Sequence, residues 1–397
     1  MQDTPRGNRL HIAIFGCRNA GKSSLINALT NQSIALVSQV PGTTTDPVYK
    51  SMELLPVGPV VIIDTAGIDD VGHLGELRVK KSMEVLNKTD LVLLVIDATR
   101  GVTQYDLDLI ERCKAKNLPL VAVINKIDLA AFQAELDVPV VEVSARTGQG
   151  IKDLKISIVK NAPSKWDDQS IIGDLLQAGD TVVLVVPLDL AAPKGRLILP
   201  QVQTIRDILD HGGIAVMARD TELKQTLANL AVKPKMVVTD SQVFKKADAD
   251  TPSDILLTSF SILFARYKGD LEMLVAGAKA IDDLKPGDKV LVAESCTHHR
   301  VEDDIGTVKI PNWLCKHVGG ELHFDWVSGS HFPDNLAEYK LVLHCGACMT
   351  NRREMLSRLM QVQEAGVPIV NYGVAIAHLH GILKRSLSPF PNLAGQL

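Results

Sequence analysis

The segment from Gly16 to Ser23 has the spacing G-x-x-x-x-G-K-S, which is typical of a loop that binds phosphate groups. Gly16 and Gly21 allow the backbone to fold closely around a phosphate chain, so that successive N–H groups point toward it. Lys22 can neutralise the β- and γ-phosphates, and the hydroxyl group of Ser23 can bind Mg²⁺. The spacing therefore predicts a site for a nucleoside triphosphate.

The residues on both sides of this loop predict the elements that hold it. Leu10 to Phe15 form an apolar run that predicts a buried strand, and Ser24 to Leu29 predict a helix. A strand, a loop and a helix in this order are the context that the phosphate-binding motif requires. We therefore expect the nucleotide to contact the following loop residues: Gly16, Asn19, Ala20, Gly21, Lys22, Ser23 and Ser24.

A second motif, Asp64-Thr65-Ala66-Gly67, follows the apolar residues 60–63. A carboxylate at the carboxyl end of a strand can hold the Mg²⁺ shell, which is the role that we expect for Asp64. The N–H group of Gly67 can sense the γ-phosphate. This motif therefore supports a triphosphate as the ligand.

Two further motifs, Asn125-Lys126-Ile127-Asp128 and Ser144-Ala145-Arg146, each follow a short apolar run. The carboxylate of Asp128 can accept two hydrogen bonds from the N1–H and 2-amino groups of guanine, which adenine does not offer. The segment that begins at Ser144 predicts another loop that contacts the base. The four motifs in this order therefore predict GTP as the nucleotide.

With these motifs, the N-terminal third of the chain resembles the translation-factor-related GTPases, and within them the tRNA-modification and Era-like branch. Pro41-Gly42-Thr43-Thr44-Thr45-Asp46 resembles the switch I signature of that branch, which is usually PGTTRD. The resemblance implies that Thr44 supplies the second Mg²⁺ hydroxyl group. Thr45 stands where Arg is common, so any role of that Arg is absent.

The same resemblance implies how hydrolysis proceeds. Ile68 stands where Ras-like enzymes have a Gln, and an Ile side chain does not orient water. In the branch that this chain resembles, an Asn of the phosphate loop binds K⁺, which replaces an arginine finger, and Asn19 matches that position. A Glu of switch II positions water there, and Glu76 has the matching spacing from Asp64. The alternative interpretation of Glu76 is an exposed helix carboxylate. The implied catalytic residues are Lys22, Asn19 and Glu76.

Length and composition limit the number of domains, the kinds of partner and the expected location of the protein. A chain of 397 residues suggests two to three domains, and the GTPase motifs end near Gly150. The net charge is −4 without a basic stripe, so nucleic acid is not favoured as a partner. The start of the chain has no signal-peptide pattern, no apolar run reaches about 18 residues, and the six cysteines lack a disulfide spacing. We therefore expect a cytoplasmic protein without membrane association.

Beyond the GTPase motifs, predicted strands alternate with predicted helices, which indicates parallel sheets with covering helices. The middle segment has no nucleotide loop and no evident catalytic set, so an interaction or dimerization module is favoured there. The predicted fold class is α/β, with a P-loop GTPase domain followed by two further small α/β domains.

Two Cys/His clusters follow predicted strands in the last third of the chain. The first is Cys296-Thr297-His298-His299, and the second is His344-Cys345-Gly346-Ala347-Cys348. Parallel strands place their carboxyl ends at one edge of a sheet, where α/β folds bind ligands. Eight of the eleven histidines and four of the six cysteines lie from Cys296 onward, which indicates a metal site.

The spacing leaves the kind of metal open. Cys296, Cys345 and Cys348 supply three thiolates, which with an imidazole can form a structural zinc site. The same thiolates can hold a 4Fe-4S cluster whose fourth iron is open or has an exchangeable ligand. A thioredoxin-like redox pair is less favoured, because the Cys-x-x-Cys motif lies beside a His and is paired with the first cluster.

Across its whole length, the chain resembles the HydF family of FeFe-hydrogenase maturation GTPases, through its GTPase motifs, its middle α/β module and its Cys-x-His…His-Cys-x-x-Cys element. The resemblance implies that Cys296, Cys345 and Cys348 bind a 4Fe-4S cluster. It also implies that His298 and His344 lie near the cluster or supply a variable fourth ligand. Three cysteines fall outside the signature, namely Cys17, Cys113 and Cys315.

The resemblance further implies a GTPase that acts as a scaffold or carrier for a transient diiron subcluster, the precursor of the hydrogenase active site. Radical-SAM maturases build and load the subcluster, and the apo-FeFe-hydrogenase receives it. The implied domains are residues 1–165 for GTP binding, 170–262 for dimerization and 263–397 for the iron-sulfur cluster. A homodimer is expected.

Two alternatives remain at this stage. A tRNA-modification-type GTPase with a structural zinc site predicts a folate- or RNA-binding domain, whereas the chain has no basic face and only 4% aromatic residues. The other alternative is a non-enzymatic iron-sulfur scaffold whose GTPase domain only regulates it. The sequence leaves open the fourth cluster ligand and the coupling between the nucleotide and the cluster.

Overall fold

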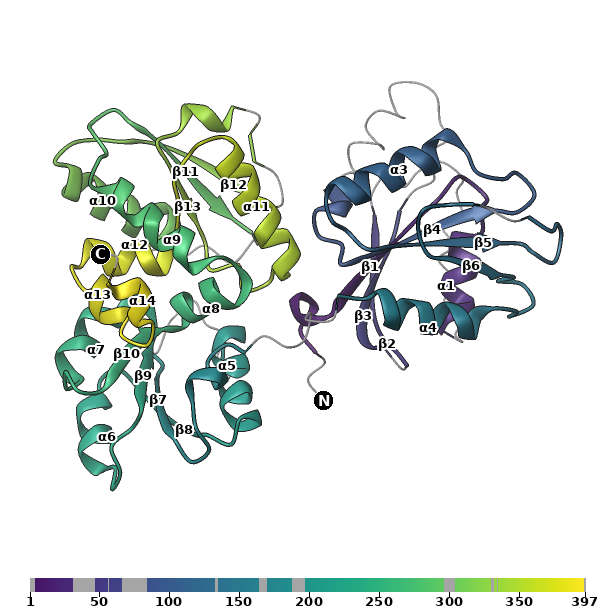
Figure 1. Ribbon diagram of the computed structural model, residues 1–397. Helices are drawn as coiled ribbons and strands as arrows, with labels where there is room; N and C mark the ends of the chain where they lie inside the picture. The colour runs from purple at the N-terminus through teal and green to yellow at the C-terminus, as the bar shows by residue number, and fades with distance from the viewer. Residues whose placement is uncertain are drawn as a thin grey trace. The chain divides into compact units, whose positions relative to one another are not determined.

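The computed structural model describes residues 4–30, 47–55, 57–65, 84–132, 135–163, 170–187, 197–295, 304–329, 332–333 and 335–395. The chain divides into two compact units, Met1–Asp168 and Gln169–Leu397, both drawn in Figure 1. Each unit consists of parallel or mostly parallel sheets with helices against them, which confirms the predicted α/β class.

The first unit contains a six-stranded sheet with the order β2-β3-β1-β4-β5-β6. Its strands pair in parallel except for β2, which is antiparallel to β3. The strands are β1 (Leu10–Phe15), β2 (Val48–Leu54), β3 (Gly58–Asp64), β4 (Leu91–Asp97), β5 (Leu120–Asn125) and β6 (Val140–Val143). The helices are η1 (Arg6–Asn8), α1 (Lys22–Thr30), α3 (Gln104–Ala115) and α4 (Ile151–Asn161).

Helices cover both faces of this sheet, which explains why its central strands are apolar throughout. Ile12 and Ile14 of β1 pack in one cluster with side chains of α1 and α4, whereas Ala13 and Phe15 pack on the other face with α3. Figure 1 shows α3 on one side of the sheet and α1 and α4 on the other.

The register of the strands places the predicted nucleotide motifs at one edge of the sheet. Ile14 pairs with Asp64, so the phosphate loop begins beside the carboxyl end of β3. Asn125 at the end of β5 pairs with both Asp97 of β4 and Val143 of β6. Segments that are far apart in the sequence therefore leave the sheet side by side.

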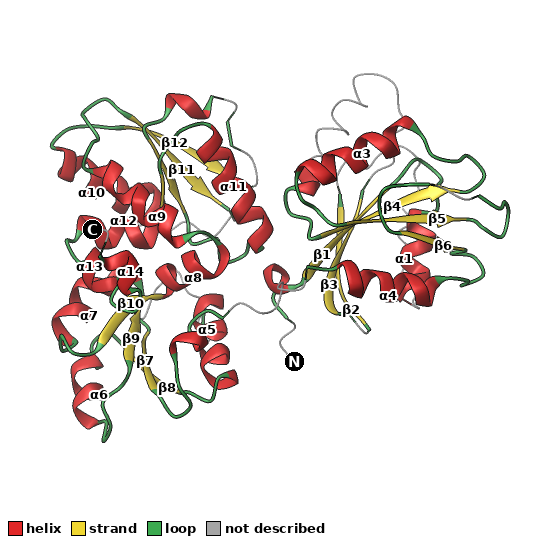
Figure 2. Ribbon diagram, in the orientation of Figure 1, coloured by secondary structure: helices red, strands yellow, loops and turns green. Residues whose placement is uncertain are grey.

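The second unit contains two four-stranded parallel sheets, with the orders β10-β9-β7-β8 and β12-β11-β13-β14. Figure 2 shows helices on both sides of the two sheets. The strands are β7 (Thr181–Val185), β8 (Ile214–Ala218), β9 (Met236–Thr239), β10 (Leu256–Ser259), β11 (Lys289–Glu294), β12 (His323–Ser328), β13 (Leu341–His344) and β14 (Ile369–Asn371).

The helices of the second unit connect these strands in chain order. They are η2 (Gly173–Leu175), α5 (Leu199–Asp210), α6 (Leu223–Asn229), η3 (Ser241–Val243), α7 (Phe244–Asp250), α8 (Phe260–Lys268), α9 (Leu271–Ala278), η4 (Lys279–Ile281), η5 (Ile305–Lys309), α10 (Ile310–Val318), η6 (Leu336–Glu338), α11 (Arg352–Glu364), α12 (Tyr372–Leu379), α13 (Leu383–Ser386) and α14 (Pro391–Ala394).

Both sheets of the second unit have the same doubly wound order, in which the first strand lies between the second and the third. In such sheets, ligands bind beyond the carboxyl ends of the first and third strands, where the winding reverses. In the C-terminal sheet these strands are β11 and β13, and Ala293 pairs with His344. The second Cys/His segment, which begins at His344, therefore starts at this reversal point.

Apolar residues from both sheets form one continuous core. Helix α8 packs against α5 from one side of the unit and against α11 and α12 from the other. The predicted boundary between residues 262 and 263 falls within this helix. Among the described residues, none of the helices is long and apolar enough to span a membrane.

Replacing Gly277 by Ala should destabilise the second unit, because the added methyl group would lie 1.9 Å from the carbonyl oxygen of Ile369. Gly277 lies in α9 and Ile369 begins β14, so only a separation of helix and strand relieves the contact. Overpacking outweighs the helix propensity that Ala gains, and we expect a net loss of about 1–2 kcal/mol in the free energy of unfolding. Chemical denaturation measures this loss.

The control is Ala276→Gln, which adds atoms at an exposed position of the same helix. It should change the free energy of unfolding by less than about 0.5 kcal/mol. A Gly277→Ala variant as stable as the parent would contradict the close packing of α9 on β14.

Candidate functional site

The phosphate loop has a backbone that requires its two glycines. Gly16 has φ 147° and Gly21 has φ 94°, values that other residues rarely adopt. A Cβ atom on Gly16 would lie 2.3 Å from the carbonyl oxygen of Val95, and one on Gly21 would lie 2.2 Å from the amide nitrogen of Asn125. The loop therefore lies directly against the ends of β4 and β5.

Lys22 is the first residue of α1 and folds back under the loop. Its side chain is buried, and its Nζ atom donates to the carbonyl oxygens of Gly16 at 2.7 Å and of Cys17 at 2.9 Å. Ser23 and Ser24 are exposed in the first turn of the helix. The positive end of the helix and the ammonium group thus meet at the concave side of the loop, where phosphate binds.

Asp64 ends β3 beside this loop and has the features of a magnesium-shell carboxylate. Its Oδ1 atom is buried and has no hydrogen-bond partner among the described residues. Burial raises the pKa of Asp64, while the charge of Lys22 and a hydrogen bond with Ser23 oppose the rise. An unsatisfied carboxylate oxygen beside a serine hydroxyl group fits the oxygen ligands of Mg²⁺.

The base-contacting loops hold Asp128 as an ionised acceptor. Its Oδ1 atom accepts a hydrogen bond from Ser144 at 2.6 Å, and its Oδ2 atom lies 2.5 Å from the guanidinium group of Arg146. The hydrogen bond from Ser144, followed by the contact with Arg146, lowers the pKa of Asp128. The carboxylate is therefore fixed in the acceptor form that guanine recognition requires.

Asn125 joins three loops of the nucleotide site. Its amide nitrogen donates to the carbonyl oxygen of Ala20 at 2.9 Å, and its side-chain oxygen accepts from the N–H group of Ala145 at 3.0 Å. Lys126 has a left-handed backbone with φ 68°, and its Nζ atom lies 2.5 Å from the carboxylate of Asp97. Sequence reasoning missed Asp97, although a carboxylate at the end of the apolar run of β4 was a signal.

Several predicted residues lie outside the described residues. They are Thr44, Gly67, Glu76, Cys296 and His298, together with Thr45 and Ile68. Asn19 is described, and it is exposed in the phosphate loop with φ 63°.

Cys345 and Cys348 lie in the loop that follows β13. Ala347 between them has a left-handed backbone with φ 50°, which turns the loop back on itself. The N–H group of Ser295 donates to the Sγ atom of Cys345 at 3.2 Å. Ser295, which directly precedes Cys296 in the sequence, therefore lies beside Cys345 at the ends of β11 and β13.

The surroundings of Cys345 fit a metal-bound thiolate. Burial raises the pKa of the Cys345 thiol, and N–H groups of Ser295 and Ala347 oppose the rise. A thiolate at this buried position is stabilised when it binds a metal ion, and N–H groups directed at sulfur are typical of tuned thiolate sites. The donor set fits an iron-sulfur cluster and also zinc, and among the described cysteines no disulfide forms.

Lys268 holds the cysteine loop through three hydrogen bonds. It is the last residue of α8, and its Nζ atom donates to the carbonyl oxygens of Ala347 at 3.2 Å, Cys348 at 2.8 Å and Thr350 at 2.8 Å. Burial lowers the pKa of Lys268 to about 8, and the sulfur atoms of Cys348 and Cys345 oppose this. The ammonium group thus fixes three carbonyl groups of one loop.

His344 is buried, and both of its ring nitrogens contact the chain. Its Nε2 atom accepts from Arg358 at 2.6 Å, so Nδ1 carries the proton and donates to the carbonyl oxygen of Cys345 at 2.7 Å. Burial and the charge of Arg358 lower the pKa of His344 to about 3. In this arrangement the neutral imidazole positions the cysteine loop.

Arg358 is the second buried cation that sequence reasoning missed. It also donates to the hydroxyl group of Ser295 at 3.0 Å and to the carbonyl oxygen of Gly329. A signal was present in α11, because Arg358 has helical spacing from the buried Met355 and Val362. A charged residue on an apolar helix face indicates a buried polar contact.

The three cysteines outside the signature lie in other elements of the chain. The Sγ atom of Cys17 lies 3.7 Å from the hydroxyl oxygen of Thr103, Cys113 is buried in α3, and Cys315 packs on the core from α10.

Three family models match the chain. The 50S ribosome-binding GTPase family matches residues 11–126, the hydrogen maturase F dimerization domain matches residues 171–269, and the hydrogen maturase F tetramerization domain matches residues 272–389. The GTPase model covers the phosphate loop, and the tetramerization model covers both Cys/His segments.

The chain is also similar to tRNA modification GTPases over about two fifths of its length. The tRNA modification GTPase MnmE of Desulfotalea psychrophila is 37% identical over 180 residues, which are 42% of this chain and 38% of that protein. MnmE of Chromobacterium violaceum is 39% identical over 167 residues, which are 41% of this chain and 37% of that protein. The chain thus spans less than two fifths of these relatives.

Replacing Asp128 by Asn should shift the nucleotide preference from guanine toward xanthine, because the amide offers one donor and one acceptor in place of two acceptors. Hydrogen bonds to a charged group contribute about 1.5–3 kcal/mol, so GTP binding should weaken at least tenfold or so. Fluorescence titration with labelled GDP and XDP measures the two affinities.

The control is Asp137→Asn, which removes an exposed carboxylate that pairs with Lys114 outside the nucleotide loops. This variant should bind both nucleotides as the parent does. Unchanged GTP affinity in Asp128→Asn would refute the assignment of the base loop.

Proposed function

Because the chain belongs to the hydrogen maturase F family, we propose that it is a GTPase and an iron-sulfur scaffold that carries the diiron precursor of the FeFe-hydrogenase active site. One observation carries the proposal: a phosphate loop closed by Lys22 and a cysteine loop supported by Lys268 occur in the same chain. The first loop suits GTP, and the second suits a thiolate-bound metal cluster.

In the GTPase part, each described residue has a role that follows from its contacts. Lys22 exchanges the carbonyl oxygens of Gly16 and Cys17 for the phosphate oxygens of GTP. Asp128 accepts hydrogen bonds from guanine while Ser144 and Arg146 hold its carboxylate. Ser23, Thr44 and Asp64 would hold Mg²⁺, which neutralises charge on the phosphates when it is bound.

Hydrolysis without a water-orienting Gln requires another source of positive charge. Asn19 is exposed in the phosphate loop and has a left-handed backbone with φ 63°. We assign Asn19 as the ligand of K⁺ and Glu76 as the residue that positions water. Slow, potassium-activated turnover follows from this assignment.

In the C-terminal part, Cys296, Cys345 and Cys348 would hold the 4Fe-4S cluster, which leaves one iron for an exchangeable ligand. His298 and His344 would lie beside the cluster or supply that ligand. His344 already holds the loop through its hydrogen bond to the carbonyl oxygen of Cys345. The diiron subcluster is cargo at this position.

The partners follow from the family. Radical-SAM maturases would load the diiron subcluster, and the apo-FeFe-hydrogenase would receive it in the cytoplasm. Residues 170–262 would form a dimer, in keeping with the matched dimerization domain, and the tetramerization domain adds a second contact between copies. Residues 1–165 would bind GTP, and residues 263–397 would hold the cluster.

A second candidate is a tRNA-modification-type GTPase with a structural zinc site. The similarity to MnmE favours it, because two of those proteins are 37% and 39% identical to this chain over 180 and 167 residues. The similarity covers about two fifths of the chain, whereas the second unit matches two hydrogen maturase F domains. The metal content of the purified protein distinguishes the two candidates.

GTP turnover should be faster in KCl than in NaCl at equal ionic strength, and Asn19→Gly should abolish the difference. Glycine is the suitable replacement, because Asn19 has a φ of 63° that glycine adopts without strain. Phosphate release in the two salts measures the effect.

The matched control is Asn117→Gly, which replaces another exposed Asn with a left-handed backbone, φ 47°, at the end of α3. It should keep the potassium response. Equal turnover of the parent protein in both salts would exclude the role of Asn19.

Replacing Cys345 by Ser should prevent stable cluster assembly, because two thiolates and a hard oxygen donor hold iron-sulfur clusters poorly. Iron and sulfide analysis and electron paramagnetic resonance of the reduced protein measure the cluster. GTP turnover should stay at the parent level, since the phosphate loop lies in the other unit.

Cys315→Ser is the control, because Cys315 lies in α10, outside the cysteine loop, and packs on the core. It should retain the cluster. A parent protein that contains zinc without iron after anaerobic reconstitution would favour the second candidate, and a normal cluster in Cys345→Ser would refute the ligand assignment.

A further inference from the structure

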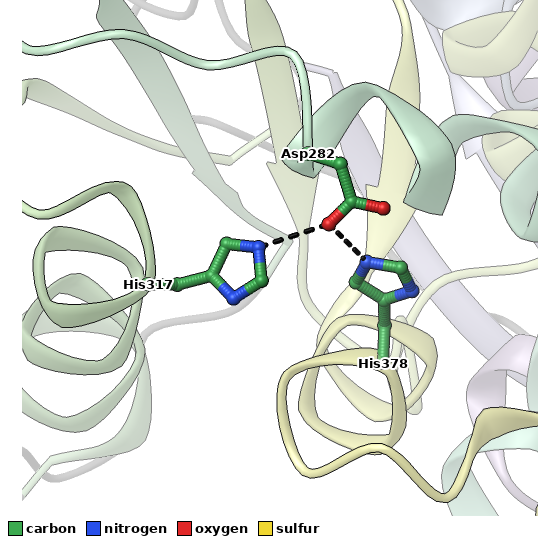
Figure 3. Close-up of side chains that lie close together, drawn as sticks. All are labelled: Asp282, His317 and His378. Carbon is green, nitrogen blue, oxygen red and sulfur yellow. Dashed lines mark hydrogen bonds and ion pairs between the residues drawn. The ribbon is translucent and has the colours of Figure 1, made fainter.

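Three side chains outside both candidate sites converge on the surface of the second unit. Asp282 directly follows η4, His317 lies in the last turn of α10, and His378 lies in the last turn of α12. Figure 3 shows the carboxylate of Asp282 between the two imidazole rings. Its Oδ1 atom lies 2.9 Å from Nε2 of His317 and 3.0 Å from Nε2 of His378.

These distances match ligands that share one metal ion. Two atoms about 2.1 Å from an ion lie about 3.0 Å apart at a right angle and about 3.4 Å apart at the tetrahedral angle. The three ligand atoms all lie within 4.8 Å of one another. A small rotation of the side chains therefore suffices for an ion to enter between them.

We propose that Asp282, His317 and His378 bind a divalent first-row transition-metal ion. Two imidazoles and one carboxylate suit Zn²⁺ or Fe²⁺, whereas Ca²⁺ and Mg²⁺ prefer a set of oxygen ligands. When the ion is bound, each ring carries its proton on Nδ1 and presents the lone pair of Nε2. Three protein ligands leave further coordination positions for water, as in zinc sites that are not purely structural.

The ends of two helices add to the attraction for a cation. His317 and His378 both lie in the last turns of their helices, where the peptide dipoles leave partial negative charge. The side chain of Asp282 is 55% exposed and that of His378 is 17% exposed, so the site is open to solvent on one side and supported by α12 on the other. An ion can enter without unfolding of the protein.

A bound ion would stabilise the helices that pack on the C-terminal sheet. It would link the turn after η4 to α10 and α12, and α12 directly follows β14, whose Asn371 pairs with His344. The ligands contain no cysteine and lie outside the Cys/His segments. The site is therefore chemically separate from the cysteine loop, and the proposal does not depend on an iron-sulfur cluster.

The test is calorimetric titration of the full chain with Zn²⁺ in the presence of saturating Mg²⁺ and GDP. The parent should bind one equivalent more than His317→Ala or His378→Ala, or bind that equivalent at least about tenfold more tightly. His323→Ala is the matched control, because His323 is exposed on β12 of the same sheet. It should keep the parent's stoichiometry.

Two further measurements keep the test decisive. Co²⁺ bound at this site should give an absorption spectrum without thiolate charge-transfer bands, and His378→Ala should lose this component. Asp282→Asn preserves the shape of an exposed residue, and it should remove the rise in melting temperature that Zn²⁺ gives to the parent and to His323→Ala. Equal zinc stoichiometry and equal stabilisation in the parent, Asp282→Asn and His378→Ala would overturn the proposal.

Discussion

The parallel register of adjacent strands is the constraint on which both candidate sites depend. Ile14 pairs with Asp64 in the first unit, and Ala293 pairs with His344 in the second. Because parallel strands end at the same edge, the ends of these strands lie side by side even though about fifty residues separate them in the sequence. The phosphate loop and the cysteine loop therefore both follow the carboxyl end of a parallel strand. This is the edge at which α/β sheets bind ligands.

A buried ammonium group then fixes each loop. Lys22 binds the carbonyl oxygens of Gly16 and Cys17, and Lys268 binds those of Ala347, Cys348 and Thr350. In each loop the ammonium group offsets the partial negative charge of these carbonyl oxygens, and its positive charge favours an anionic group nearby, such as a phosphate or a thiolate. Burial of a charged lysine is unfavourable by itself, so the anionic ligand and the cation stabilise each other.

The sequence predicted the strands and loops that depend on neighbouring residues, and it missed the side-chain contacts between residues that are distant in the chain. Apolar runs followed by motif residues identified the strands, the phosphate loop and the cysteine loop. Lys268 meets the cysteine loop across about eighty residues, and Asp282 meets His378 across 96. No local spacing encodes such contacts, because the packing of α8 and α12 on the sheets creates them. The predicted boundary at residue 262 lies within α8, whose apolar residues belong to the common core of the second unit.

Helix α8 connects the start of the second unit to the cysteine loop. Arg266 donates to the carboxylate of Asp174 at 3.0 Å and to the carbonyl oxygen of Ser170 at 3.1 Å, directly after the segment that leads from the GTPase unit. Two residues further along the same helix, Lys268 holds the carbonyl groups of the cysteine loop. Residues 170–174 and the cysteine loop thus contact the same end of one helix. This helix couples the nucleotide to the cysteine loop only if it has two stable positions and each nucleotide state favours a different one. Coupling therefore depends on whether α8 moves between the GTP-bound and the GDP-bound states.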